Sequence, residues 1–217
     1  MSRGLALASL SRLTPEQWGM VTAEQARDLG VSRVDLSRLL GDGALERVAG
    51  ASRVYRLTGS PPDPELDGLR AAWLQLGDSR PPSMRLRRPD AVVSRRSAAM
   101  ALGFGDLLAD VHEFYVTRRR QPRRSDLRLR VRPALPARDW RVVDSLPVCT
   151  AARIVSDLLA DREDESAVAR ICQEALRADL LTPDVLERVA EAHAEAYGHG
   201  SGPAFAATLA GAEASRR

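Results

Sequence analysis

The first 58 residues contain short helical and extended patterns in close succession. Leu5, Leu10 and Leu13 lie at helical spacing and predict an amphipathic opening helix that ends near Trp18. This stretch is too short and too soon followed by arginine to be typical of a signal peptide, so we expect it to belong to the folded protein.

Two capping signals predict the next two helices. Thr22 followed three positions later by Gln25 predicts a helix that ends at Gly30. Ser32 and Asp35 have the same spacing and predict a third helix, in which the carboxylate suits the positive helix end. The apolar residues expected to face the core from these helices and the corner between them are Ala26, Leu29, Val31, Val34, Leu36, Leu39 and Leu40.

Residues 45–57 change to an extended pattern. Two runs, 45–48 and 53–57, flank a small turn and predict a β-hairpin. The order of helix, helix, short break, helix and hairpin is that of a winged helix-turn-helix. The sequence therefore predicts an α+β protein, mostly helical with small β elements, in which residues 1–58 form a winged helix-turn-helix.

The segment after the hairpin interrupts regular structure. Three prolines and a glycine lie between residues 59 and 64, and they predict a linker there. We expect a larger α+β domain over residues 65–217 that ends in helices. Its predicted helices are 66–76, 94–102 with Ser94 as cap, 150–159, 165–176, 183–196 and 203–214, and its predicted strands are 112–117, 127–132 and 140–143.

Charge is segregated along the chain. All 32 basic residues are arginine, which excludes a P-loop lysine, a Schiff base and the usual carboxylate–lysine nuclease site. Residues 80–141 carry 16 arginines and 6 acidic residues, a net charge of +10, whereas residues 142–217 carry 7 arginines and 13 acidic residues, a net charge of −6. The pattern predicts either a face that binds a polyanion or internal docking of the two parts.

The third helix is the expected reader of the DNA major groove. Arginine can form paired hydrogen bonds with guanine, and a wing commonly contacts phosphates or the minor groove. Tyr55 of the wing is expected in the core. The candidate DNA contacts are Ser32, Arg33, Ser37 and Arg38 on the helix and Arg47, Arg53 and Arg56 on the wing. The candidates for a second basic surface are Arg118, Arg119, Arg120, Arg123, Arg124, Arg128, Arg130 and Arg132.

Candidate catalytic features are weak. The three histidines, at 112, 193 and 199, lack ligand spacing, and Gly103–Gly105 lacks the third glycine of a dinucleotide fingerprint. The carboxylates of 161–165 suit a helix start. Cys149 and Cys172 suggest reduced thiols in a cytoplasmic protein. We expect no enzyme activity, no metal, no cofactor and no membrane span.

Several segments resemble the AbiEi-family antitoxins, the type IV antitoxins of bacterial toxin–antitoxin operons. GMVTAEQA at 19–26, GVS at 30–32, LERV at 45–48 and VYRL at 54–57 resemble their N-terminal winged-helix domain, and LPVCTAARIVSDL at 146–158 resembles a later motif. The resemblance implies repression of the protein's own operon at inverted repeats by a monomer or homodimer. It also implies that the second domain counteracts a nucleotidyltransferase toxin, functionally and without requiring a stable complex.

Two other functions remain open at this point. One is a stand-alone winged-helix transcriptional regulator whose C-terminal domain dimerises or senses a ligand. The other is a nuclease fused to a winged helix, which the absence of lysine disfavours. A nucleotidyltransferase-like gene next to this one favours the antitoxin, and metal-dependent cleavage of DNA favours the nuclease.

Overall fold

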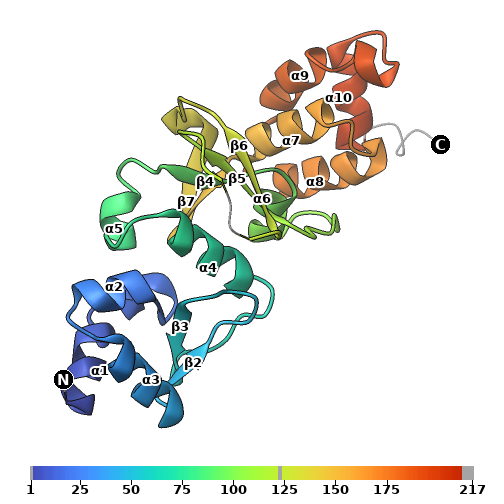
Figure 1. Ribbon diagram of the computed structural model, residues 1–217. Helices are drawn as coiled ribbons and strands as arrows, with labels where there is room; N and C mark the ends of the chain where they lie inside the picture. Colours follow the sequence, from blue (N-terminus) through green and yellow to red (C-terminus); the bar gives the residue numbers. More distant parts are fainter. Residues whose placement is uncertain (1, 122–123, 212–217) are drawn as a thin grey trace. The chain divides into compact units, whose positions relative to one another are not determined.

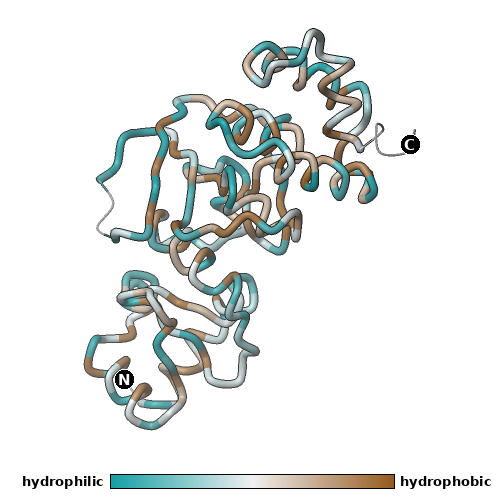
Figure 2. Tube along the Cα trace, turned by 90° about the vertical axis from the view of Figure 1, so that its right-hand side faces the viewer, coloured by the Kyte–Doolittle hydropathy of each residue, from teal (hydrophilic) through white to brown (hydrophobic). Residues whose placement is uncertain are grey.

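The computed structural model describes residues 2–121 and 124–211, and these fold into two compact units (Figure 1). Of the described residues, the first unit comprises 2–91 and 144–146, and the second comprises 92–121, 124–143 and 147–211. The fold class is α+β, as predicted, with helices and two sheets. Hydrophobic and hydrophilic positions are interspersed along the trace of both units (Figure 2), and no described helix is long and apolar enough to cross a membrane.

The first unit is a winged helix-turn-helix followed by two further helices. Strands β1, β3 and β2 form an antiparallel sheet in that order, with Val21 opposite Tyr55 and Arg47 opposite Tyr55 on the other side. The elements are α1 (Arg3–Ser11), the 3-10 helix η1 (Thr14–Gln17), β1 (Met20–Thr22), α2 (Ala23–Asp28), α3 (Arg33–Gly41), β2 (Leu45–Arg47), β3 (Val54–Leu57), α4 (Asp67–Leu76) and α5 (Pro82–Arg85).

Local signals start the helices where the sequence predicts. Thr22 and Gln25 form a capping box at α2, and Ser32 and Asp35 form one at α3. Each box satisfies backbone N–H groups that would otherwise lack partners at the helix start. The two helices then bury one face each in a shared core that includes Leu10, Val21, Ala26, Val31, Leu36, Leu39 and Tyr55.

Three apolar residues that we expected in the core face solvent instead. Leu5 is 63% exposed, Val34 57% and Leu29 36%. Ala6 and Leu10, four positions apart, set the buried face of α1, so Leu5 points elsewhere. Leu29 lies just beyond the last turn of α2, and Val34 lies outside the stripe by which α3 contacts the core.

The predicted linker, 59–64, lies inside the first unit rather than between two units. Asp63 receives a hydrogen bond from the Leu66 backbone N–H at 3.1 Å and forms an ion pair with Arg70 at 2.7 Å. The rings of Trp18 and Trp73 meet edge to face with centroids 6.3 Å apart. These contacts attach α4 to the winged helix, so the prolines bend the chain without separating two bodies.

The second unit contains a five-stranded sheet in the order β6-β5-β4-β8-β7. Strand β5 pairs in parallel with β6, and β4 pairs in parallel with β8. Asp144 and Ser145, which are assigned to the first unit, both have positive φ and connect β7 to β8 in a two-residue turn. The strands are β4 (Ala91–Val93), β5 (His112–Val116), β6 (Leu127–Val131), β7 (Trp140–Val143) and β8 (Leu146–Cys149).

Helices complete the second unit. Helix α6 packs on β5 and α7, and α10 packs on both α8 and α9 (Figure 1). The helices are α6 (Arg95–Ala101), η2 (Ala137–Asp139), α7 (Ala151–Ala160), α8 (Glu165–Arg177), α9 (Pro183–Glu191), η3 (Glu195–Tyr197) and α10 (Gly202–Ala210). Helix α9 ends earlier than the predicted 196, because Ala192 caps it before η3. The predicted helical end at 212–214 lies outside the described residues.

Candidate nucleic-acid interface

Helix α3 presents the four polar residues that we predicted as DNA contacts. Ser32, Arg33, Ser37 and Arg38 are all exposed, whereas Leu36 and Leu39 are buried on the opposite face. Arg33 and Ser37 are four residues apart and therefore share one face of the helix. The buried leucines fix the helix against the core, so its outer face is a rigid platform for the two guanidinium groups.

The start of α3 is held by a tight capping box. The Ser32 backbone N–H donates to Asp35 Oδ2 at 3.1 Å, the Ser32 hydroxyl donates to the same oxygen at 2.6 Å, and the Asp35 N–H donates to Ser32 Oγ at 3.1 Å. Hydrogen bonds from the Ser32 hydroxyl and backbone lower the pKa of the Asp35 carboxyl. The charged carboxylate therefore stabilises the helix end that carries Arg33.

The wing carries two exposed arginines. Arg47 is exposed, and its guanidinium carbon lies 5.7 Å from the ring centroid of Tyr55, which is buried as predicted. Arg53 is exposed and has a left-handed backbone, with φ of 63°. Its carbonyl oxygen accepts a hydrogen bond from the Ala23 N–H at 2.9 Å. The base of the wing is thus tied to the start of α2, and both guanidinium groups remain accessible.

Arg56 is not a surface residue, which corrects one of the predicted wing contacts. It is buried on β3, where it forms an ion pair with Glu46 at 2.6 Å and a second with Asp67 of α4. Burial alone would lower the pKa of the Arg56 guanidinium, but the hydrogen bonds to Glu46 and Asp67 outweigh it and raise that pKa. Arg56 therefore joins the sheet to α4, and we leave it out of the candidate interface.

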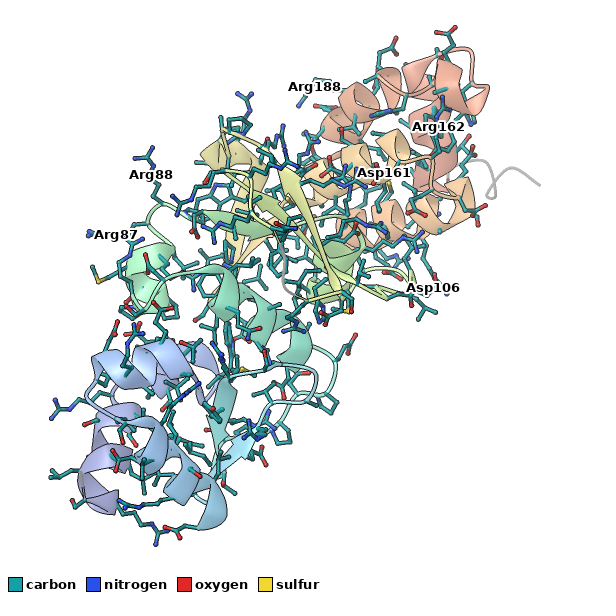
Figure 3. All side chains as sticks on the ribbon, viewed as in Figure 1. Arg87, Arg88, Asp106, Asp161, Arg162 and Arg188 are labelled. Atoms are coloured by element: carbon teal, nitrogen blue, oxygen red, sulfur yellow. The ribbon has the colours of Figure 1, made fainter. Side chains whose placement is uncertain are left out.

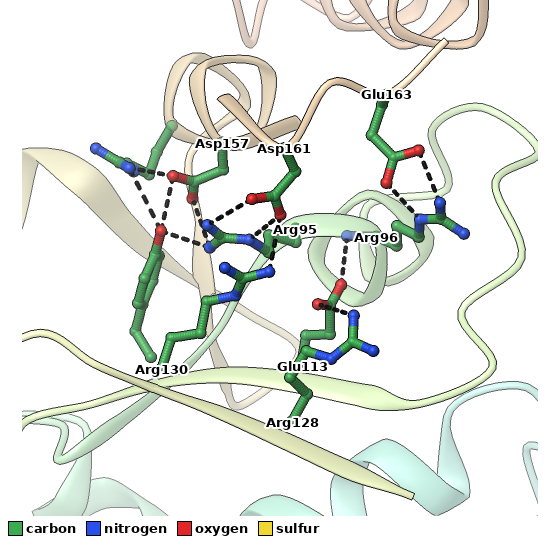
Figure 4. Close-up of polar contacts among 10 residues, drawn as sticks. Arg95, Arg96, Glu113, Arg128, Arg130, Asp157, Asp161 and Glu163 are labelled. Carbon is green, nitrogen blue, oxygen red and sulfur yellow. Dashed lines mark hydrogen bonds and ion pairs between the residues drawn. The ribbon is translucent and has the colours of Figure 1, made fainter. Parts of the chain in front are cut away.

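The three arginines on and just after β6 each pair with a carboxylate, although Arg128 remains exposed. Arg128 pairs with Glu113 at 3.6 Å, and Arg130 pairs with Asp161 at 3.0 Å (Figure 4). Arg132 pairs with Asp139 at 3.3 Å. Each of the three predicted residues thus has an acidic partner, which comes from β5, from η2 or from the residue just after α7. This favours internal docking over polyanion binding for this part of the basic segment.

The arginines of the connection before β6 differ in exposure and pairing. Arg118 and Arg119 are exposed, and Arg120 is partly buried. Arg124 pairs with Asp126 at 2.5 Å. Arg123 lies outside the described residues. Sequence reasoning did not single out Arg87 and Arg88, which are exposed after α5 and project outward in Figure 3.

A buried polar network in the second unit was also not predicted. The Tyr115 hydroxyl donates to Asp157 Oδ1 at 2.7 Å and accepts from Arg95 Nη1 at 2.6 Å. Arg95 Nε also donates to Asp161 at 2.5 Å, and Arg153 pairs with Asp157. Burial and the hydrogen bond to Asp157 raise the pKa of the Tyr115 hydroxyl. The network connects β5, α6 and α7.

Arg95 occupies an unusual backbone position. Its φ is 55°, in the left-handed region that residues other than glycine rarely adopt. Ser94 lies at the N-cap of α6, but its side chain makes no capping hydrogen bond, in contrast to our expectation. The turn instead directs Arg95 toward Asp161 and lets Arg96 pair with Glu163 through two hydrogen bonds of 2.7 Å each. The charge segregation in the sequence was the signal for these contacts.

The groups most relevant to catalysis and metal binding are dispersed or buried. Among residues 2–121 and 124–211, no three His, Cys, Asp or Glu side chains are arranged so that they could hold a metal ion. Cys149 and Cys172 are buried free thiols, and burial raises both pKa values, that of Cys172 to about 12. Neither thiol is therefore ionised near neutral pH.

Comparison with known families supports a regulatory role. The family model described as "Transcriptional regulator, AbiEi antitoxin" matches residues 9–49. The match begins within α1 and runs through α2, α3 and β2 into the wing. It confirms the resemblance noted in the sequence for this segment, which includes Ser32–Arg38 and Arg47. No curated protein shows significant similarity to the chain.

Proposed function

We propose that this chain, which carries the AbiEi antitoxin regulator segment at residues 9–49, binds operator DNA and represses its own operon. The supporting observation is the exposed face of α3, where Arg33 and Arg38 lie on a helix fixed by a capping box. The outer face of this helix fits the major groove, which admits a helix. An operator-binding protein of this kind acts in the bacterial cytoplasm.

The two arginine sets have different roles in this proposal. Arg33 and Arg38 read base edges, with Arg33 donating a pair of hydrogen bonds to guanine. Arg47 and Arg53 contact the phosphate backbone from the wing, which fixes the register of the helix without reading sequence. Ser32 and Ser37 add hydrogen bonds on the same face. On an operator with inverted repeats, a homodimer would place one chain on each half-site.

Gel-shift titration against the protein's own upstream DNA tests the repressor function. Arg33→Ala should reduce discrimination between that duplex and random DNA roughly 5- to 150-fold. Arg53→Ala should weaken binding to both and reduce the salt slope by about 1, because one phosphate contact is lost. Arg188→Ala, an exposed arginine of the second unit, is the matched control for charge. Absence of any salt-sensitive binding would refute the repressor function.

We further propose that the second unit counteracts a nucleotidyltransferase toxin. The support is the resemblance of residues 146–158 to the later motif of these antitoxins. Co-expression with the adjacent nucleotidyltransferase-like gene should restore growth. The Arg33→Ala variant should restore it equally from an independent promoter, because the two activities are carried by different units. Lack of rescue by both proteins, or lack of such a neighbouring gene, would favour the stand-alone regulator instead.

A further inference from the structure

Val34 is an exposed apolar residue at the centre of the outer face of α3. Its exposed fraction is 57%, although α3 has a well-defined buried stripe that includes Leu36 and Leu39. Val34 lies next to Arg33, three residues before Ser37 and four before Arg38, and all of these are exposed. A branched apolar group is therefore surrounded by guanidinium and hydroxyl groups on one helix face.

Folding of the unit does not explain a valine at this position. The capping box uses Ser32 and Asp35, and the core uses residues on the other side of the helix. Valine also has a lower helix propensity than alanine or the long polar residues, because its branched side chain loses rotamer freedom. A polar side chain suits an exposed second helix position better, so the valine fits a partner that offers an apolar group.

The surroundings of Val34 specify the chemistry of that partner. The guanidinium groups before and after Val34 on the helix match guanine edges and phosphates. They disfavour binding of this face to an extended apolar patch on another protein. In the DNA major groove, the C5-methyl group of thymine is the apolar feature, and it lies beside the hydrogen-bonding groups of neighbouring bases. The combination of Arg33, Val34 and Ser37 therefore matches a major-groove edge that contains a thymine.

We infer that Val34 contacts the C5-methyl group of a thymine and selects thymine at one operator position beside the base read by Arg33. The inference rests on the proposed operator binding and adds a base preference to it. Cytosine lacks the methyl group and presents an amino donor instead of a carbonyl acceptor, so it gives Val34 no matching contact. The ligand is thus duplex DNA with thymine next to a guanine-containing step.

Replacing thymine with deoxyuridine tests this contact directly, because only the methyl group is removed. The shortest upstream duplex that the wild-type protein binds is prepared with each thymine replaced in turn. One position per half-site should show about fourfold weaker binding, the factor that corresponds to burying one methyl-sized group. In Val34→Ala, which lacks the two γ-methyl groups, the same replacement should have a smaller effect, and the double-mutant cycle should show that the two changes are coupled.

A matched variant and a folding control accompany this test. Leu5→Ala removes another exposed apolar side chain of the same unit, and it should retain the sensitivity to deoxyuridine. Both variants should unfold at or slightly above the wild-type temperature, because both side chains are exposed and alanine has the higher helix propensity. Failure of the wild-type protein to bind any upstream duplex counts against operator binding itself. Binding that tolerates deoxyuridine everywhere, or a sensitivity that is undiminished in Val34→Ala, overturns the Val34 contact alone.

Discussion

Arg53 and Arg56 lie three positions apart on one hairpin, and their environments differ completely. Arg53 precedes β3 at the wing turn and is exposed, whereas Arg56 lies on the central strand of the sheet between two carboxylates. The same residue type is therefore a surface residue at position 53 and a member of a buried ion pair at position 56. Its role depends on whether an acidic partner from another element reaches it.

Arg56→Ala should lower the free energy of unfolding of the first unit by about 3 kcal/mol, because Asp67 would remain largely buried without its nearest cation. Arg53→Ala should change that free energy by less than about 0.5 kcal/mol, since the side chain is exposed. Urea unfolding of both variants measures the difference. Arg56→Ala combined with Asp67→Ala should recover part of the loss, and equal effects of the two single substitutions would contradict our assignment of Arg56.

The stability of helix α3 depends on its N-terminal cap and on its buried face. It has nine residues, fewer than an isolated helix needs for stability in water. The capping box fixes its first turn, and Leu36 and Leu39 fix its inner face against α1, α2 and the sheet. The order of the exposed face of α3 therefore depends on its cap, which requires a charged carboxylate at Asp35.

The stability of this cap should depend on pH. The pKa of Asp35 is lowered in the folded chain, so its stabilisation is present above the ordinary aspartate pKa of about 4 and is lost as pH falls through the lowered value. The difference in unfolding temperature between the wild-type protein and Asp35→Asn should be constant near neutral pH and shrink in acid. NMR titration of the Asp35 carboxyl gives its pKa directly. A difference that persists unchanged through the acid range would refute this role.

Within the second unit, arginines of the basic segment form ion pairs with carboxylates of the acidic segment. Arginines of the segment 80–141 pair with carboxylates at the end of α7 and just beyond it, as Arg95 and Arg130 do with Asp161. Arg96 does the same with Glu163. The formal charge of +10 on the basic segment therefore overstates the charge available to a polyanion. Arg118 and Arg119 remain exposed on this segment.

The pair Arg96 and Glu163 should contribute measurably to the stability of the second unit. Its geometry is bidentate and partly buried, so a double-mutant cycle with alanine should give a coupling energy of about 1 kcal/mol that decreases with salt. Arg170 and Asp106 provide the control, because both side chains are more than half exposed and should couple only weakly. Equal coupling in the two pairs would contradict the importance of burial here.

The sequence alone determined the features that depend on neighbours within a few residues. The caps at Thr22 and Ser32, the hairpin and most helix bounds follow from such local hydrogen bonds and periodicities. The exposed polar face of α3 was predicted for the same reason, because Leu36 and Leu39 define which side is buried. The family model matches residues 9–49, the part of the chain in which these local signals occur in close succession.

Only the tertiary structure decided which distant groups meet. The local sequence predicts Arg56 on the wing surface, but in the fold α4 places Asp67 beside it. The local sequence predicts a linker at the proline-rich segment, but in the fold Asp63 pairs with Arg70 of α4. Val34 was placed in the core because it is apolar, and only packing shows which apolar residues a helix leaves outside. Arg95 and Asp161 are 66 residues apart, so no local pattern predicts their contact. Burial and ion pairing over such separations are set by the assembled fold, because they require elements that the chain brings together only when it folds.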